Sequence, residues 1–418
     1  MKTKIFLISV ILAAFNLHII NAQNLDVELV KVTNQLEILT NQQDSLYAVF
    51  ETLKLNQVQE LIHQYVLPEL VKGEEIIQHK AYCLVYNEEH EQAKWVAHII
   101  PTEIIKGNNT RSNDFREDSL ILTGSCGDSD YFLTTTQQDG TVVYEGFGYD
   151  RGHLAPSADF KWSKEALSES YFYSNMSPQV ADFNRGGWSL LEDMMRSYVI
   201  ENNVDLYIVT GPVLHDSLEI IVKSINKVSI PEYYFKVAYD AVNERGIGFL
   251  MQNTTIDYPT EYYAVSIDSI EKFTGINFFV GIDDAIENKI ESSDDVTEWL
   301  PEKEKNDVSP IKRINLPENT YNTVQSREFM GQNQVITVCG TVVGAYTSKN
   351  EHTFLNLDKS FPNHLFTATV FKTNKINFSY DPEEYLYGKK ICVTGKITEY
   401  NGTPSMSIIN EKSVGIIE

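Results

Sequence analysis

Residues 24–70 contain no glycine, and no proline before Pro68, so nothing in this long stretch interrupts a helix. Apolar side chains recur along it at steps of three and four residues, which places them on one helix face, and Gln43 falls in the same row. The spacing predicts a helix. Two interpretations of the row stay open: a coiled coil that forms a homodimer, or packing of the helix on its own domain. The row consists of Leu29, Val32, Leu36, Leu39, Leu46, Phe50 and Leu53.

The first 22 residues have the pattern of a secretory signal peptide. Lys2 and Lys4 precede the apolar run "IFLISVILAAF", and the small Ala22 stands before Gln23. The run is shorter than the roughly 20 residues that span a bilayer, although an uncleaved anchor is the alternative. No later segment could span a membrane. We therefore expect an exported protein, periplasmic or extracellular, that is not embedded in a membrane.

The pattern beyond the N-terminal helix predicts a mixed chain with several domains. "AYCLVY" and "KWVAHII" read as a hairpin, "EYYFKVAYD" and "RGIGFLMQN" as paired strands, and "GGWSLLEDMMRSYVIEN" as a helix. An acidic stretch with Pro301, Pro310 and Pro317 reads as a linker. The predicted organisation is a signal peptide at 1–22, a helical segment at 23–75, a central domain at 76–285, a linker at 286–322 and a strand-rich domain at 323–418.

The formal net charge of −24 limits the kinds of nucleic-acid protein that this chain can be. Proteins that coat DNA without regard to sequence present a basic surface, so the balance argues against that class. An enzyme that holds one phosphate with a metal and a few arginines is still compatible with an acidic chain.

Two motifs in the central domain combine residue types suited to phosphodiester chemistry. The first is "DRGH", residues 150–153, and the second is "SNMSPQVADFNRGGWSLLED", which contains Asn175, Asn184 and Glu192. A neutral imidazole accepts a proton from water near pH 7, a guanidinium fits phosphate, and an amide oxygen is a hard ligand that suits Mg²⁺. Gly152 is expected to let the backbone turn so that Arg151 and His153 face one pocket.

The second motif also carries spacing information. Asn184 stands at the entrance of the predicted helix, and Glu192 lies eight residues on, about two turns later and on the same side. The alternatives are an Asn that only caps the helix and an ordinary exposed glutamate. His79, His90, His98 and His215 have no clustered partners in the sequence, and no role is assigned to them.

Together the two motifs resemble those of the DNA/RNA non-specific endonuclease family, the ββα-metal nucleases, and above all its endonuclease G-like branch. The resemblance extends to "TRSNDFREDSL", "YIVTGPV", "PEYYFKV" and "SIDSIEKFTGINFF". It covers roughly residues 80–282. It implies an α+β fold: a ββα-metal core with a mainly antiparallel sheet flanked by helices.

The resemblance also implies a role for each motif residue. His153 matches the general base and Asn184 the sole direct Mg²⁺ ligand. Glu192 matches the carboxylate that holds metal-bound water, and Arg151 matches the contact to phosphate and transition state. Asn175 matches an active-site Asn that orients groups around the base. Arg111 matches an upstream substrate-binding arginine, with Arg116 as a competing assignment. Asp150 is expected only to brace the loop.

The C-terminal domain has a different pattern and resembles an OB-fold. About five short strands are predicted, with Gly340 and Gly395 in mid-strand where a small barrel bends. OB-folds often bind single-stranded nucleic acid through aromatics and a basic groove, but a purely structural barrel is the alternative. The candidate binding residues are Phe354, Phe366, Phe371, Lys372 and Tyr400.

The chain has four cysteines: Cys83, Cys126, Cys339 and Cys392. Their spacing matches no zinc pattern, and an exported protein can hold them as disulfides or as free buried thiols. If the barrel register places Cys339 and Cys392 on neighbouring strands, a cross-strand disulfide is expected.

The function expected from these observations is an exported endonuclease that hydrolyses the phosphodiester bonds of DNA and RNA. Mg²⁺ is the expected cofactor, with Mn²⁺ as a substitute, and the resemblance implies 5′-phosphate products. A nucleic-acid-binding protein with an inactive nuclease core is the main alternative. A metal phosphodiesterase acting on smaller substrates is a third.

Overall fold

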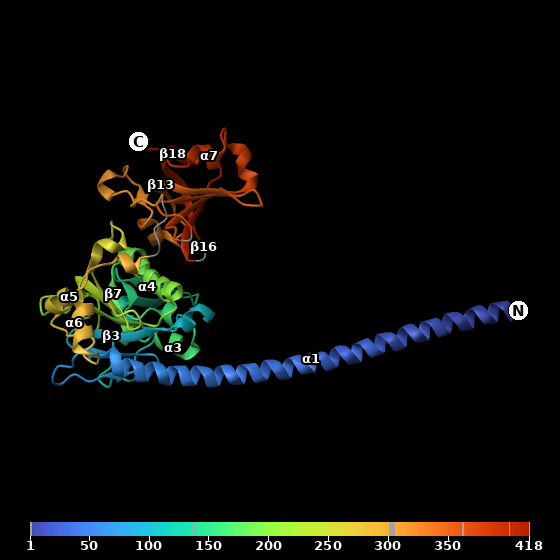
Figure 1. Ribbon diagram of the computed structural model, residues 1–418, viewed down its shortest axis with the longest axis horizontal. Coiled ribbons are helices and arrows are strands. Elements are labelled where there is room, and N and C mark those ends of the chain that lie inside the picture. The colour runs from blue at the N-terminus through green and yellow to red at the C-terminus, as the bar shows by residue number, and fades with distance from the viewer. Residues whose placement is uncertain (1, 138, 301–305, 362, 401, 418) are drawn as a thin grey trace. The chain divides into compact units, whose positions relative to one another are not determined.

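The computed structural model describes residues 2–137, 139–300, 306–361, 363–400 and 402–417. The chain forms two compact units, residues 1–57 and 58–418. As the glycine-free sequence predicts, one helix, α1 (Lys2–Tyr65), fills the first unit and ends in the second (Figure 1). Among the described residues, no helix combines the length and the apolar character needed to cross a membrane.

The apolar row of α1 lies on its surface. The seven side chains from Leu29 to Leu53 are each between 47% and 71% exposed. The last turns of the helix, in the second unit, are different: Val58 and Ile62 are buried, as is Val66 directly after the helix. The helix prediction is confirmed, and the row from Leu29 to Leu53 is left uncovered.

The second unit contains an α+β domain built on an antiparallel sheet. The predicted hairpin and the predicted strand pair are both present, as β2–β3 and β9–β10. In spatial order the strands are β1 (Ile77–Gln78), β2 (Tyr82–Asn87), β3 (Gln92–Ile100), β8 (Leu206–Pro212), β9 (Tyr233–Asp240), β10 (Arg245–Gln252) and β11 (Ala264–Val265).

The two faces of this sheet carry different layers. Gly246 and Gly248 of β10 leave room on one face for α5 (Ile267–Thr274) and α6 (Asp284–Glu291), because an added Cβ would meet isoleucines of these helices. Side chains alternate along a strand, so Phe249 and its partner Lys236 face the other side. There Lys236 reaches Leu154, which directly follows the first predicted motif, and Trp188, which belongs to the second.

The motif-bearing layer consists of short elements. Before "DRGH", the chain forms α2 (Asp128–Tyr131) and then an antiparallel hairpin of β4 (Phe132–Thr136) and β5 (Val142–Gly146). β6 (Asp150–His153) pairs antiparallel with β7 (Met176–Gln179), with α3 (Lys164–Glu169) between them in sequence. α4 (Ser189–Asn202) follows β7. Two strands and one helix therefore form a ββα unit on the sheet.

The expectation of a plain linker over 286–322 is wrong for its first part. α6 extends to Glu291, and Trp299 is buried with its ring stacked on Tyr198 at 4.5 Å. Burial of the apolar side chains of α6 and of Trp299 stabilises this segment. The many acidic residues around them made the segment look like a linker in the sequence. Residues 301–305, also in the predicted linker, lie outside the described residues.

The C-terminal part forms a closed barrel. Its wall has the strand order β13–β14–β15–β17–β16, and β16 returns to pair with β13. All wall pairs are antiparallel except β15–β17, and α7 (Pro382–Leu386) precedes β16. The bounds are β12 (Tyr321–Asn322), β13 (Val335–Thr347), β14 (Thr353–Leu357), β15 (Phe366–Val370), β16 (Lys390–Tyr400), β17 (Thr403–Ser407) and β18 (Val414–Ile416).

Five wall strands match the number predicted, while the assignment to the OB-fold stays a prediction. Phe366 is fully buried in the barrel core, so its expected role as a binding aromatic is corrected. Gly340 and Gly395 lie in mid-strand as expected. Close packing explains both glycines. A Cβ added to Gly340 would lie 2.8 Å from Asp358, and one added to Gly395 would lie 2.9 Å from Met406.

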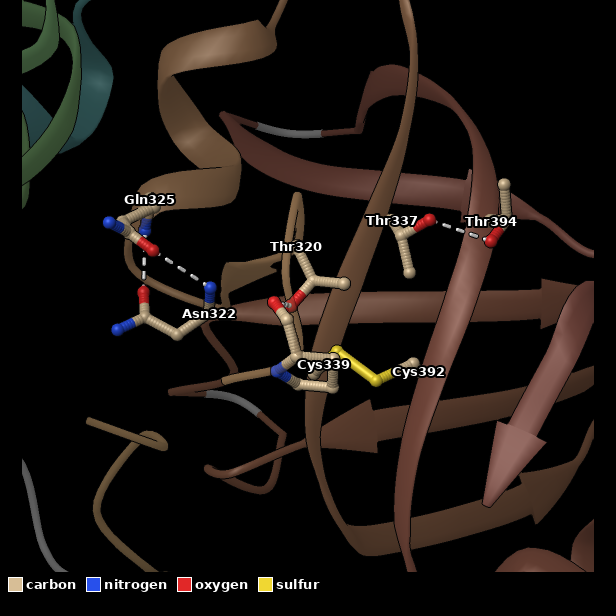
Figure 2. The surroundings of a disulfide bond; sticks show 8 residues. Thr320, Asn322, Gln325, Thr337, Cys339, Cys392 and Thr394 are labelled. Carbon is tan, nitrogen blue, oxygen red and sulfur yellow. Dashed lines mark hydrogen bonds between the residues drawn. A yellow bond between two sulfur atoms is a disulfide. The ribbon is translucent and has the colours of Figure 1, made fainter. Parts of the chain in front are cut away.

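One disulfide closes the barrel wall. Cys339 and Cys392 are directly paired on β13 and β16 and form the expected cross-strand bond, as Figure 2 shows. Cys83 and Cys126 are free and buried. Beside the disulfide, Asn322 and Gln325 exchange two side chain–backbone hydrogen bonds of 3.0 and 2.9 Å, which fix the turn after β12.

Candidate active site

A cleft of about 700 Å³ opens over the ββα unit. Side chains alternate along β6, so Arg151 and His153 face the cleft together. Gly152 between them is extended rather than turned, which corrects the expected reason for this glycine. An added Cβ would lie 2.1 Å from the side chain of Gln179 on β7. Gly152 is therefore needed for close packing of the two strands.

His153 stands among positive charges and aromatic rings. Its Nε2 atom is buried and has no hydrogen-bond partner among the described residues. Burial, followed by the charges of Arg111 and Arg151, lowers the pKa of His153 to about 3. The ring packs edge-on against Tyr171 at 5.0 Å. The imidazole is thus neutral at physiological pH, with a nitrogen free to accept a proton.

Arg151 is held from several sides. Its Nη1 donates to Asp128 Oδ1 and to the Tyr173 hydroxyl, both at 3.2 Å. Its guanidinium lies 3.6 Å from the centre of the Phe115 ring. These contacts leave the side chain partly exposed but fix its direction, which suits a group that meets phosphate in a defined geometry.

The two upstream arginines differ in their position relative to the cleft. Arg111 lines the cleft and donates from Nε to the Tyr171 hydroxyl at 3.1 Å. Arg116 instead donates to Asp114 and to the Ser168 carbonyl oxygen, and its guanidinium lies 4.0 Å from the Phe172 ring centre. Of the two, only Arg111 is among the residues that line the cleft.

Asn175 is buried behind the cleft rather than in its wall. Its Oδ1 accepts from the Ala155 backbone nitrogen at 2.9 Å, and its Nδ2 donates to the carbonyl oxygens of Ala155 and Ser170. These bonds fix the chain that follows His153. The geometry is compatible with the orienting role expected for Asn175, which stays a prediction.

Asn184 enters the cleft from a wide π-helical turn, η4 (Phe183–Trp188), which precedes α4. Gly186 within that turn has non-helical backbone angles. The prediction that Asn184 and Glu192 are separated by two regular helical turns is therefore wrong. The Nδ2 atom of Asn184 donates to Asp150 Oδ2 at 2.9 Å. Asp150 also accepts two hydrogen bonds from Arg185, so it does more than brace a loop.

Glu192 lines the same cleft from the first turn of α4. Burial raises the pKa of Glu192 to about 7, against the opposing charges of Lys236 and Arg196. The amide oxygen of Asn184 and the carboxylate of Glu192 are both hard oxygen donors. Because the amide nitrogen of Asn184 is engaged by Asp150, its oxygen is left for a cation, and this donor set fits Mg²⁺.

Sequence reasoning missed the charged layer beneath the cleft. Lys236 is buried and donates to Thr210 Oγ1 at 2.6 Å, and Arg196 donates to Asp159 at 2.7 Å. His98, expected to have no partner, lies 3.0 Å from Asp159, and His79 lies 3.0 Å from Asp118. The lysine inside the apolar strand "YYFKVAY" could have indicated a buried charge. The ion pairs of His98 and His79 join residues far apart in the sequence, and no local pattern indicates them.

The cleft is basic although the chain is acidic. Between residues 111 and 196, five basic side chains line it against two acidic ones, Asp150 and Glu192. A local excess of positive charge attracts phosphate at short range, whatever the net charge of the chain. The basic side chains are Arg111, Arg151, Lys161, Arg185 and Arg196.

Comparisons with known proteins agree with this geometry. The sequence model of the DNA/RNA non-specific endonuclease family matches residues 63–285. Bovine mitochondrial endonuclease G is 31% identical over 48% of this chain and 68% of its own length. A nuclease of Nostoc sp. is 33% identical over 51% of this chain and 76% of its own. The nuclease of Serratia marcescens is 30% identical over 54% and 82%.

A chain from the crystal structure of the EndoG/EndoGI complex is 26% identical, over 52% of this chain and 89% of its own length, with a TM-score of 0.43. The match to the family model covers the whole ββα unit and its sheet. The protein is therefore a hydrolytic nuclease and belongs to the DNA/RNA non-specific endonuclease family.

Proposed function

We propose that the protein is a Mg²⁺-dependent endonuclease that cuts both DNA and RNA and uses His153 as its general base. The observation that carries the proposal is the neutral imidazole of His153, whose unpartnered Nε2 lies in a basic cleft opposite Asn184 and Glu192. A proton acceptor, phosphate-binding cations and hard oxygen donors meet in one cavity.

The cleft residues divide the work of hydrolysis. His153 takes one proton from the attacking water as the water oxygen bonds to phosphorus. Arg151 and Arg111 hold the non-bridging phosphate oxygens. The bond to the 3′ oxygen breaks, and that oxygen gains a proton from solvent, which leaves a 5′-phosphate. Asn184 and Glu192 would hold the metal, which supplies charge stabilisation for phosphate and leaving group.

The first test separates the candidate functions. The full chain is incubated with plasmid DNA, structured RNA and a small phosphodiester, with Mg²⁺, with Mn²⁺ and with EDTA. Metal-dependent cutting of both polymers supports the proposal. Polymer binding without cutting under either metal would instead favour the nucleic-acid-binding alternative, and hydrolysis of the small ester alone would favour a phosphodiesterase.

Export is part of the proposal. It is supported by the pattern of residues 1–22 and by the Cys339–Cys392 disulfide, because such bonds persist mainly in oxidising compartments. Expression in a bacterial host followed by fractionation tests it. We expect mature protein beginning at Gln23 in the periplasm or medium, and full-length chain held in the cytoplasm would contradict export.

Homodimerisation is proposed from the first unit alone. The row from Leu29 to Leu53 keeps a heptad spacing with every side chain exposed, and a single helix of this kind is marginal in water without a partner. Light scattering should give twice the chain mass. Replacing Leu39 and Leu46 by Glu should halve that mass, whereas Ile38→Glu, on another exposed face, should not.

A substrate-holding role for the barrel is proposed from a groove of about 530 Å³. Tyr346, Phe354, Phe371 and Tyr400 line it, and the first two rings stack at 5.1 Å. Lys372 is ion-paired with Glu351, so the groove offers stacking more than charge. Tyr400→Ala should weaken binding of single-stranded DNA in EDTA about tenfold. Unchanged binding would leave the barrel structural.

A further inference from the structure

Three carboxylates converge on the side of the sheet opposite the catalytic layer. Asp268 and Glu271 belong to α5, and Glu291 is the last residue of α6. One oxygen from each lies within 4.8 Å of the others. The two helices pack on each other and on β10, and Figure 1 shows them side by side. Within the described residues, this is the only group of three or more acidic, His or Cys side chains arranged so closely.

Glu291 makes this cluster different from a solvated acidic surface. It is only 6% exposed, and its Oε1 atom has no hydrogen-bond partner among the described residues. Burying an unpaired carboxylate is unfavourable, because the charge loses its hydration without gaining a partner. Its position in the last turn of α6 adds to that cost, because the carboxyl end of a helix carries a partial negative charge.

Two nearby basic side chains pair with other acids. Lys289 pairs with Glu244 at 2.7 Å, and Arg245 pairs with Glu298 at 2.7 Å. Within the described part of the chain, no ion pair joins a basic group to Asp268, Glu271 or Glu291. Burial and the charges of Glu271, Glu287 and Asp268 raise the pKa of Glu291 to about 8. The cluster therefore requires either a cation or a proton.

We propose that Asp268, Glu271 and Glu291 form a structural binding site for a divalent cation of the Ca²⁺ type, separate from the catalytic cleft. Three carboxylates can offer three to six oxygens, and Ca²⁺ accepts six to eight in flexible geometry. Asp268 is exposed, so water completes the shell. The absence of nitrogen and sulfur donors in the cluster disfavours zinc. Bound cation would join α5 to α6 over β10.

The test uses the full chain carrying Asn184→Ala, which weakens the proposed catalytic metal site. Calorimetry with Ca²⁺ alone, in metal-free buffer near pH 7.5, should show one site and an increased melting temperature on binding. Adding Glu271→Gln, or separately Glu291→Gln, should weaken that binding at least tenfold while the unliganded protein stays folded. Glu219→Gln, an exposed glutamate of another loop, is the matched control and should change nothing.

Two results would overturn the proposal. One is Ca²⁺ binding that is the same with and without Glu271→Gln. The other is no Ca²⁺ effect at all, together with a Glu291→Gln protein at least as stable as its parent. The second result would show that Glu291 carries a proton in place of a cation. Neither result depends on nuclease activity, so this test and that of the proposed function fail independently.

Discussion

Asp150 and Asn184 stand 34 residues apart in sequence and are joined by a hydrogen bond of 2.9 Å from the amide nitrogen to the carboxylate. This bond selects the orientation in which the amide oxygen of Asn184 is available to a cation. Asp150 thereby connects the strand that carries His153 to the turn that carries Asn184, the proposed metal ligand. Such partners of metal ligands commonly affect metal affinity by one or two orders of magnitude.

Asp150→Ala should therefore raise the Mg²⁺ concentration needed for half-maximal cleavage about tenfold. The activity at saturating Mg²⁺ should fall less. A Mg²⁺ titration of the cleavage rate measures both. Asp216→Ala removes an exposed acid outside the cleft and serves as control, and an unchanged Mg²⁺ requirement in the Asp150 variant would refute the positioning role.

Two nearby arginines give a matched pair. Arg111→Ala should lower kcat/KM about 100-fold, because a guanidinium that contacts the phosphate is lost. Arg116→Ala, which breaks contacts to Asp114 and Ser168, should lower thermal stability while cleavage of correctly folded protein persists. Equal loss of kcat/KM in both variants would mean that the structure does not discriminate between them.

The packing of Gly152 predicts a stability defect. Gly152→Ala forces a methyl group against Gln179 and should cost about 1–3 kcal/mol in the free energy of unfolding. Urea denaturation checks this. Gln179→Ala combined with Gly152→Ala should recover part of the loss, since the clash is with that side chain. A double variant less stable than Gly152→Ala would point to another cause.

The lowered pKa of His153 has a defined pH signature. The unfolded imidazole titrates near 6.5 and the folded one near 3, so the unfolded state binds more protons between these values. Stability from this group is thus complete above pH 6.5 and is lost as pH falls toward 3. In NMR spectra without metal, the His153 ring should stay neutral from pH 8 to pH 5. Titration near 6.5 would contradict this.

The disulfide should stabilise the barrel specifically. Cys339 and Cys392 are 53 residues apart. A disulfide that closes a loop of that size adds about 2–4 kcal/mol to the free energy of unfolding. Reduction should speed hydrogen exchange in β13 and β16 and leave β8 and β9 unchanged. Cys126→Ala, which alters a buried free thiol, should not reproduce the effect. Equal exchange before and after reduction would indicate a barrel that does not depend on the bond.

Local sequence patterns were enough to predict the helices and strands. The two motifs could be recognised because the residues of each lie close together in the sequence. Glycine-free periodicity identified α1, and short apolar runs identified β2, β3, β9 and β10. Contacts between distant segments were beyond reach: the acidic content of 286–300 hid the packing of Trp299, and nothing near Asp128 marked it as a partner of Arg151. Gly152 was found for the wrong reason, since only the register with β7 places Gln179 beside it.

The role proposed for His153, in the cleft over the ββα unit, is that of the general base. It is tested most directly by comparing the Mg²⁺-dependent plasmid cleavage rate of His153→Ala with that of His215→Ala, an exposed histidine outside the cleft. We predict a loss of at least 100-fold in the first variant and wild-type rate in the second. A His153→Ala protein that folds and cleaves near the wild-type rate would contradict the account.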